Sequence, residues 1–420
     1  MALEKIKSTL SSRCKALSMD EVSGSLGDLG TFLPLILNLA AIKVILFSPA
    51  LFWAGFYNVL TGFIWNSPMP VQPMKTIAAV ALTLGANGSP GLTPEEVMGA
   101  GISVGTIVLV LGVTGFVDFV NWIVPLAVVR GLQLGLGFSM IKSALNLIMP
   151  LPFVSQVDCI LLGVLSMLFV LFCSRVDRLK FVPTALILTI IGFVIAMVQT
   201  SHAGRSVARP DFPPVWVGSS LVWDDVWNGF LKAGLAQLPL TTLNSVVSVC
   251  DLNNKRLFKH EPEKYISRRS VATSVGLMNL SGLWFGAMPM CHGAGGLAAQ
   301  YKFGARTGTA IIILGLAKMI VGVILGESAS VVLEYFPKSI LGAMLVFAGL
   351  SLSLAGISKM THVGDEDVEK NQMIFLTTAA VTVVLKTGWG FCAGMIMAIF
   401  YGGFDHVVVY VREKQYRTLI

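Results

Sequence analysis

Long apolar stretches alternate along the chain with short breaks that are rich in Gly, Pro and charged residues. We distinguish fourteen such stretches, most of them close to the ~20 residues that cross a bilayer as a helix. The first seven cover residues 25–46, 49–66, 70–87, 96–117, 121–147, 157–175 and 181–200. The second seven cover residues 226–250, 270–287, 291–304, 307–326, 337–357, 373–388 and 390–411. The pattern predicts an all-α polytopic membrane protein with about 14 transmembrane segments.

The composition excludes an ordinary soluble globular protein. Of the 420 residues, 55% are hydrophobic and only 13% are charged, and the mean hydropathy is +0.77, whereas soluble domains are near 25% charged. The net charge of +7 comes from Lys and Arg in short segments between apolar stretches, which is typical of cytoplasmic loops and does not indicate a nucleic-acid partner. The six Cys are far apart and form no CxxC pair, so we expect no disulfide framework, no metal site and no cofactor.

The distribution of Lys and Arg predicts that both termini face the cytosol. Basic clusters precede the first stretch and follow the sixth, eighth and fourteenth, whereas residues 88–95 and 327–336 contain neither residue type. We divide the chain into a cytosolic N-terminal segment 1–22, a first seven-span repeat 23–200, an extracytosolic linker 201–225, a second repeat 226–411 and a cytosolic tail 412–420. Segment 1–22 lacks the apolar core of a cleavable signal. The expected location is the plasma membrane or a vacuolar or other endomembrane.

Seven spans in each half place the halves in opposite orientations, which is the geometry of an inverted repeat. Weak internal symmetry supports this arrangement. The first and eighth stretches each carry Leu-Pro beside polar residues, in 27–34 (GDLGTFLP) and 236–242 (AQLPLTT). The third and tenth each carry a Pro-Met break, in 67–73 (SPMPVQP) and 287–296 (AMPMCHGAGG). We therefore expect the third and tenth spans to be half-helices.

The two breaks predict an anion site near the middle of the membrane. Pro68, Pro70 and Pro73 prevent regular helix and favour a helix that begins near Pro73. The glycines of 293–296 leave backbone amides sterically open where the second half-helix begins. Two helix N-termini would then face each other, and each offers free amides and about half a positive charge to an anion. Paired broken segments at matching places in two repeats are typical of a transporter's substrate site.

Four side chains near the breaks are candidates for substrate binding or proton coupling. Lys75 adds a full charge in the first turn of the first half-helix. Because a Lys within a span is energetically costly, it either has a functional role or extends its ammonium toward the membrane–water interface. Gln72 and His292 add donors beside the amides, or else serve as a helix-end cap and a hydrogen-bonded interior histidine. Asp28 is the one carboxylate well inside the first stretch, and it either carries a coupled proton or caps a helix break.

The sequence offers little support for an enzyme. It contains no GxxxxGK[ST] and no HExxH motif. Cys291 and His292 are adjacent, but adjacency in sequence does not make a nucleophile and its base. We predict that the protein is not an enzyme.

Three segments resemble the signatures of the molybdate transporter family within the sulfate permease superfamily. They are 27–34 (GDLGTFLP), 68–75 (PMPVQPMK) and 285–298 (FGAMPMCHGAGGLA), the last continuing to 303–308 (FGARTG). The resemblance implies seven-plus-seven inverted repeats divided into a core and a gate domain, with substrate between the third and tenth helices and flanked by the first and eighth. Most members of the wider superfamily end in a cytosolic STAS domain, for which residues 412–420 leave no room, and this favours the molybdate branch.

The breaks and the resemblance together imply a substrate site and a function. The substrate-binding residues are expected to be Thr31, Gln72, Lys75, Gln237, Thr241, His292, Gly293, Ala294 and Gly295, with Asp28 and His292 as candidates for proton coupling. The expected function is secondary active transport of molybdate by a moving core domain. Moving a dianion into a cell at about −100 mV costs roughly 4.6 kcal/mol, at ~2.3 per charge, so uptake needs coupling. The expected partners are molybdate and the bilayer, with protons and a second copy of the chain as further candidates.

Other interpretations stay open on the sequence alone. A carrier of sulfate or another oxyanion would use the same helix N-termini, because sulfate and molybdate are both tetrahedral dianions that differ mainly in size. A nucleobase carrier of the same fold would be expected to carry acidic groups in the eighth and tenth spans, where this chain has Gln237, Thr241 and His292. A non-transporting receptor would leave the paired broken helices without a purpose.

Overall fold

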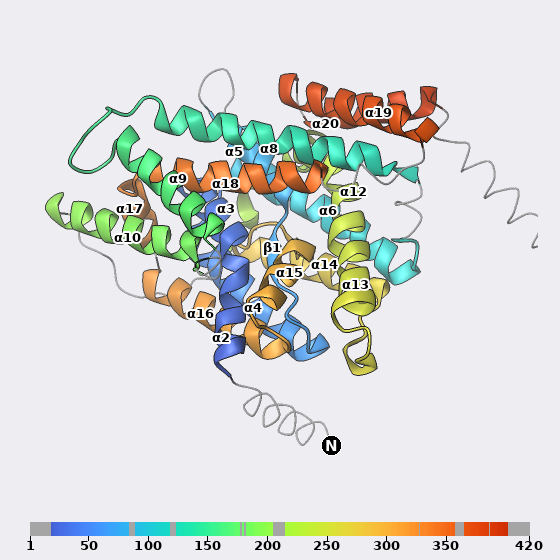
Figure 1. Ribbon diagram of the computed structural model, residues 1–420, viewed down its shortest axis with the longest axis horizontal. Coiled ribbons are helices and arrows are strands. Elements are labelled where there is room, and N and C mark those ends of the chain that lie inside the picture. The colour runs from blue at the N-terminus through green and yellow to red at the C-terminus, as the bar shows by residue number, and fades with distance from the viewer. Residues whose placement is uncertain are drawn as a thin grey trace, which may run out of the picture.

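The computed structural model describes residues 18–83, 89–117, 123–176, 179, 182–204, 215–326, 328–357, 365–385 and 387–401 of the chain. Residues 1–17 of the predicted N-terminal segment 1–22, and the whole predicted tail 412–420, lie outside these residues. Within the described ranges the chain is helical, apart from a two-stranded ribbon and short connections (Figure 1). The predicted all-α class is therefore confirmed.

The helices of the first half begin at the polar residues and prolines that interrupt the apolar stretches. Ser18 caps one helix through its hydroxyl oxygen, and Thr93 and Pro94 start another with a capping box and a proline in the first turn. These helices are α2 (Met19–Ser25), α3 (Leu29–Ala41), α4 (Phe47–Trp65), α5 (Lys75–Leu82), α6 (Pro94–Thr114), α8 (Leu126–Ile148), α9 (Ile160–Arg175) and α10 (Thr184–His202).

The second half opens with a helix of 35 residues, Trp223–Leu257, in which α-helical and π-helical turns alternate. Its α-helical parts are α11 (Trp223–Gly229), α12 (Leu235–Leu240) and α13 (Val249–Leu252). Pro239 lies inside it and cannot donate a backbone hydrogen bond. The π-helical turns lie directly before and after the α-helical segment that contains this proline. The other helices are α14 (Arg268–Gly282), α15 (Ala294–Lys302), α16 (Gly308–Leu325), α17 (Ser328–Glu334), α18 (Lys338–Ile357), α19 (Asp365–Val384) and α20 (Thr387–Phe400).

Six helices among the described residues are long and apolar enough to cross a bilayer. They are Met19–Ala41, Pro94–Thr114, Thr184–His202, Trp223–Leu257, Gly308–Leu325 and Lys338–Ile357. Each of the fourteen predicted stretches contains a helix, and α17 adds a helix within 327–336, where none was expected. The protein is thus a helical membrane protein, while the number of crossings and the seven-plus-seven arrangement stay predictions.

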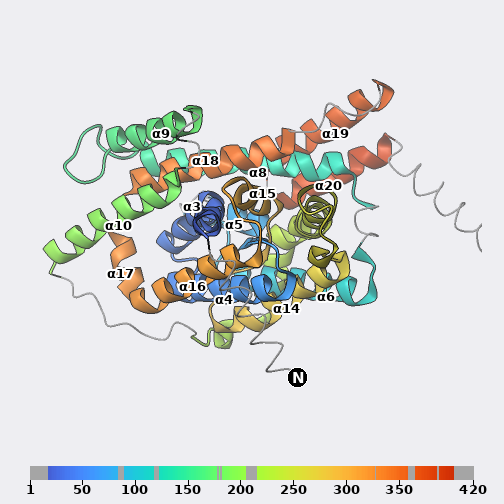
Figure 2. The ribbon, with the colours of Figure 1, turned by 60° about the horizontal axis from the view of Figure 1, so that its bottom comes forward.

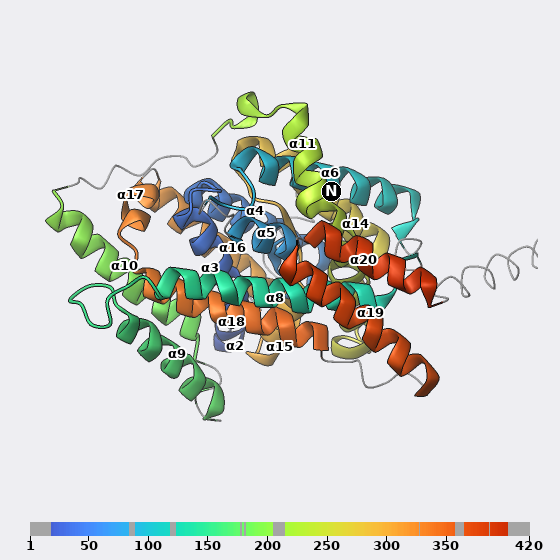
Figure 3. The ribbon, with the colours of Figure 1, turned by 90° about the horizontal axis from the view of Figure 1, so that it is seen from above.

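The helices lie in three layers, which Figure 2 shows in profile. Helices α8, α9, α18 and α19 form one layer, α4, α6, α14 and α16 form the opposite one, and α3, α5 and α15 lie between them. The closest pairs join helices far apart in sequence: α4 packs on α16, α6 on α14 and α8 on α18. Figure 3 shows α8 running along α18 across the face of the molecule. Packing therefore depends on contacts between the two halves of the chain.

Glycines allow two of these helix pairs to approach closely. A Cβ added at Gly55 of α4 would lie 2.5 Å from the carbonyl oxygen of Gly315 in α16, and one added at Gly315 would lie 2.5 Å from the carbonyl oxygen of Gly55. Gly137 of α8 and Gly349 of α18 face each other in the same way, at 2.5 and 2.6 Å. Lipid provides no hydrophobic force between helices, so van der Waals packing at small residues has to hold such pairs together.

Two short strands form an antiparallel ribbon between the outer layers. The strands are β1 (Val71–Pro73) and β2 (Met290–His292), and Gln72 is paired with Cys291. Each strand leads directly into a short helix, β1 into α5 and β2 into α15. Prolines prevent helix on the β1 side, and backbone that is not helical in a membrane protein has to be satisfied within the protein.

Two asparagines complete the hydrogen bonding of the ribbon. Asn58 of α4 accepts a hydrogen bond from the Val71 amide (2.7 Å). Asn279 of α14 accepts one from the Met290 amide (2.9 Å) and donates one to the Met290 carbonyl (2.7 Å). Both asparagines are at most 1% exposed, so the outer layer supplies the partners that water would otherwise provide.

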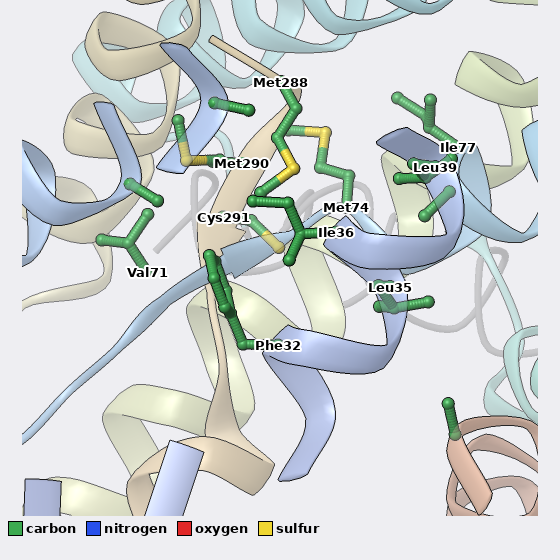
Figure 4. Packing of buried hydrophobic residues seen from close by; sticks show 14 of the residues in the cluster. Phe32, Leu35, Ile36, Leu39, Val71, Met74, Ile77, Met288, Met290 and Cys291 are labelled. Atoms are coloured by element: carbon green, nitrogen blue, oxygen red, sulfur yellow. The ribbon is translucent and has the colours of Figure 1, made fainter. Parts of the chain in front are cut away.

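Apolar side chains pack around the ribbon and shield it. Figure 4 shows Phe32 and Ile36 of α3 beside Met74, Met290 and Cys291. The first four of these residues are each at most 1% exposed. The ribbon therefore lies in the protein core rather than against lipid.

We predict that Gly315→Ala destabilises the protein by about 1–3 kcal/mol, because the new methyl group overlaps the backbone of α4. Thermal unfolding of the purified protein in detergent measures the change. Gly30→Ala is the matched control, since nothing lies within 4 Å of a Cβ added in α3 at that position. Equal unfolding temperatures for the two variants would contradict the close packing of α4 and α16.

Candidate functional site

The N-terminus of α15 is built from small residues that let polar side chains approach its backbone. Gly293 precedes the helix, and no side chain caps it. A Cβ added at Gly293 would overlap the Gln72 carboxamide, and one added at Gly296 would lie 2.7 Å from Gln72 Nε2 and 2.8 Å from Asp28 Oδ1. Only glycine fits at these two positions. Gln72 and Asp28 therefore lie against the first turn of α15, where backbone amides have no partner within the helix.

Asp28 connects the members of a buried polar cluster. Its carboxylate accepts a hydrogen bond from Gln72 Nε2, which also donates to Thr31 Oγ1 (2.7 Å). Lys318 Nζ of α16 lies 3.4 Å from the second carboxylate oxygen. Asp28 is 0% exposed and Lys318 is 4% exposed. Because an unpaired charge is strongly disfavoured at such burial, we attribute the pairing of Asp28 with Lys318 to mutual neutralisation.

Lys318 was not predicted from the sequence as part of the site. Its ammonium also lies 3.5 Å from the centroid of the Phe32 ring, which is a cation–π contact. A usable signal was present: one Lys in the otherwise uncharged stretch 308–325, and one carboxylate well inside the first stretch. Lone charges of opposite sign in two apolar spans predict an ion pair, because each is costly without the other.

The N-terminus of α5 is held by a second set of polar residues. The helix begins at Lys75, directly after β1, without a side-chain cap. The Thr76 amide donates to Gln237 Oε1 (2.8 Å), and Gln237 Nε2 donates to Thr241 Oγ1 (2.7 Å). Gln237 and Thr241 belong to the long helix Trp223–Leu257 and are at most 1% exposed. These two predicted residues therefore lie together, at the start of α5 rather than at α15.

Lys75 carries a charge that has no direct partner. Its side chain is half-buried, and it forms no hydrogen bond or ion pair with the residues that the structure describes. Among these residues, the nearest opposite charge is the Asp28 carboxylate, with which it makes no direct ion pair. Since Lys318 already compensates Asp28, the Lys75 ammonium is available to an anion at this site.

His292 lies apart from the other predicted side chains. It is 0% exposed, its Nε2 atom is 3.2 Å from the Ser274 hydroxyl, and its ring meets the Trp65 ring edge-on at 5.5 Å between centroids. In the ribbon His292 is paired with Val71, one position along from the Gln72–Cys291 pair. Side chains alternate along a strand, so His292 points to the face opposite Gln72. The structure does not bring these two side chains together.

The start of α15 is also accessible from a cavity. Ala294 and Gly295 line a space of about 540 Å³ between α15, α8 and the helix Trp223–Leu257. A Cβ added at Gly295 would meet nothing within 4 Å. Within the described part of the chain, no group of three or more His, Cys, Asp or Glu is placed to hold a metal ion. The arrangement offers helix amides, amide side chains and one free ammonium, which are groups that bind oxyanions.

Comparison with solved structures shows that this fold also occurs in two other membrane proteins. The structure of SLC26A9 superposes on this chain with a TM-score of 0.67 at 16% identity, covering 93% of this chain and 66% of that one. The transmembrane domain of the bicarbonate transporter BicA from a cyanobacterium superposes with a TM-score of 0.60 at 16% identity, covering 90% of this chain and 97% of that one. At these identities the likeness concerns the fold.

Sequence comparison is more specific. A family model described as "Molybdate transporter of MFS superfamily" matches residues 20–140 and 229–352. Molybdate transporter 2 of Arabidopsis thaliana is 37% identical over 92% of this chain and 88% of its own length. Molybdate transporter 1 of the same plant is 37% identical over 94% of this chain and 90% of its own length. The chain belongs to the molybdate transporter family.

Proposed function

We propose that this protein is a secondary active transporter of molybdate, which it binds between the N-termini of α5 and α15. The observation that carries the proposal is the unpaired Lys75 ammonium at the start of α5, beside a ribbon whose two strands lead into α5 and α15. A tetrahedral oxyanion would accept hydrogen bonds from helix amides and a charge-assisted bond from Lys75. The names of the relatives support molybdate as the substrate.

The packing of helices supports an inverted repeat. If the predicted spans are numbered in order, α4 is the second, α6 the fourth, α14 the ninth and α16 the eleventh. An inverted repeat exchanges each span with the span seven positions away. This exchange converts the packed pair α4–α16 into the pair α14–α6, which is also packed. It maps the pair α8–α18, the fifth and twelfth spans, onto itself, and it does the same for the two paired strands of the third and tenth spans.

The two asparagines that bind the ribbon follow the same rule. Asn58 lies on the second span and bonds the strand of the third, and Asn279 lies on the ninth and bonds the strand of the tenth. In a seven-plus-seven inverted repeat, α5 and α15 are half-helices that point away from each other, with their positive ends toward the substrate. Both termini would face the cytosol, by the distribution of Lys and Arg.

Proton coupling is part of the proposal, with Asp28 and His292 as the candidate groups. Asp28 lies at the start of α15 and is linked to both Gln72 and Lys318, so a change in its charge would be felt in the binding site. His292 is farther from the proposed substrate but lies on the ribbon that connects the two half-helices. Uptake of a dianion against a negative membrane potential requires the cotransport of a cation, and a proton carried by one of these side chains would meet that need.

Lys75→Gln is expected to weaken molybdate binding by roughly 10- to 150-fold, because a hydrogen bond to a charged group contributes about 1.5–3 kcal/mol. Calorimetry on the purified protein measures the affinity. Lys302→Gln is the matched control: it removes the same charge at the far, exposed end of α15. Unchanged affinity in the Lys75 variant would remove the residue on which the proposed site rests.

Purified protein in liposomes is expected to take up molybdate saturably, with sulfate as a much weaker competitor. The physical reason is size: two tetrahedral dianions differ in how well they fill one rigid pocket. Uptake is measured with fixed molybdate and increasing sulfate. Equal competition would assign the site to sulfate-type oxyanions in general, and the absence of saturable uptake of either anion would overturn transport as the function.

Breaking the Asp28–Lys318 pair on one side is expected to be more harmful than replacing both partners. Asp28→Asn leaves a buried ammonium uncompensated and should cost about 3–5 kcal/mol of stability, whereas Asp28→Asn combined with Lys318→Met should recover most of that loss. Thermal unfolding of four proteins, the wild type, Asp28→Asn, Lys318→Met and the double variant, gives the interaction between the two positions. Additive effects would show that the two charges do not stabilise each other.

The same variants test coupling. If Asp28 carries the coupled proton, the double variant should still bind molybdate while its uptake no longer responds to a pH gradient. His292→Gln is measured alongside it. Wild-type proton dependence in both variants would exclude both candidate groups.

A further inference from the structure

Two cavities with polar and charged side chains in their walls flank α8, one near each end of the helix. The first, of about 540 Å³, is lined by Arg130 and Gln133 of α8 and by Asn244, Ser248 and Gly295. The second, of about 400 Å³, is lined by Ser139, Lys142 and Asn146 of α8 and by Thr83 and Ser89. At about 30 Å³ per water, each has room for on the order of ten or more water molecules, and thus for a hydrated ion.

Each cavity contains one cation of α8 that is free to bind an anion. Arg130 is half-buried and Lys142 is exposed, and neither forms a hydrogen bond or ion pair with the described residues. The acidic group in the first cavity is already engaged, since Asp251 lies 3.1 Å from both Lys255 and Arg268. Lys232 in the second cavity is paired with Glu96. Arg130 in the first cavity and Lys142 in the second therefore each contribute a positive charge that no acidic group among the described residues neutralises.

The two cavities approach the two half-helices of the proposed site from different ends. The first reaches the start of α15 through Ala294 and Gly295. The second meets the far end of α5 through Val80 and Thr83. Arg130 and Lys142 are twelve positions apart on one helix, a separation of about 18 Å at 1.5 Å per residue. That distance is a large part of the ~30 Å hydrocarbon thickness, so if α8 is the fifth span, as proposed above, the two cations lie toward opposite membrane surfaces.

We infer that α8 carries an anion-capture site at each end, with Arg130 concentrating the oxyanion on the side where α8 begins and Lys142 on the side where it ends. This inference rests on the proposed function. The ligand is a hydrated oxyanion. The Arg130 guanidinium can bind two of its oxygens at once, whereas Lys142 acts as a point charge. Charges that line an access cavity raise the rate of capture, and salt weakens their effect.

The test is uptake into right-side-out and inside-out membrane vesicles that contain the full chain. Arg130→Gln should lower the uptake rate at low molybdate concentration by about three- to ten-fold in one vesicle type, and Lys142→Gln in the other. Both effects should largely vanish at about 0.5 M salt, because screening then acts over a few ångströms. The maximal rate and the calorimetric affinity of the central site should stay as in the wild type.

Two controls separate capture from folding and from total charge. Arg130→Lys keeps the charge and should retain most of the uptake rate. Lys259→Gln removes one charge from an exposed position and should leave uptake unchanged in both vesicle types. Losses that are independent of salt, or equal in the two vesicle types, would overturn the capture role. If Lys75→Gln abolishes binding while the two α8 variants behave as wild type, this inference fails and the proposed function stands; if the wild type shows no saturable uptake, both fail.

Discussion

Backbone that leaves the helix inside an apolar interior has to find its hydrogen-bond partners within the protein, because lipid supplies none. In this chain the partners come from pairing β1 with β2 and from Asn58 and Asn279 in the neighbouring layer. The pairing is antiparallel, so α5 and α15 leave the ribbon in opposite directions and begin at its two ends. The close packing of the outer helices holds the ribbon in place, and the arrangement of the polar groups follows from it.

The second constraint is the cost of buried charge. Asp28 and Lys318 come from distant parts of the chain and neutralise each other in the core, and the Asp28 carboxylate in turn orients the Gln72 carboxamide through a hydrogen bond. Lys75 is left without a partner at the start of α5. In the proposed site the buried Asp28 and Lys318 charges compensate each other, whereas the Lys75 charge stays available to attract an anion.

Several features of the site were predictable because they depend on short segments. Three prolines within six residues and a run of glycines indicated two interrupted segments, and the structure has strands followed by short helices there. Pairing between segments was harder to predict. Lys318 was missed, although its isolation in an apolar stretch was visible, and the sequence did not indicate that Gln237 and Thr241 lie at the start of α5. His292 was expected either to add a donor beside the helix amides or to be a hydrogen-bonded interior histidine, and strand alternation turns its buried ring to Ser274 and Trp65.

By itself the sequence determined the helical membrane class, the positions of the two broken segments, and the residue types able to meet an anion, because hydrophobic periodicity, proline sterics and glycine's missing side chain act over a few neighbouring residues. Only the tertiary structure showed which charges are paired and which are free, on which face of the ribbon each side chain lies, and which residues of α8 line cavities. These properties depend on contacts between residues far apart in the chain, and of them only the Asp28–Lys318 pair left a signal in the sequence, as two isolated opposite charges.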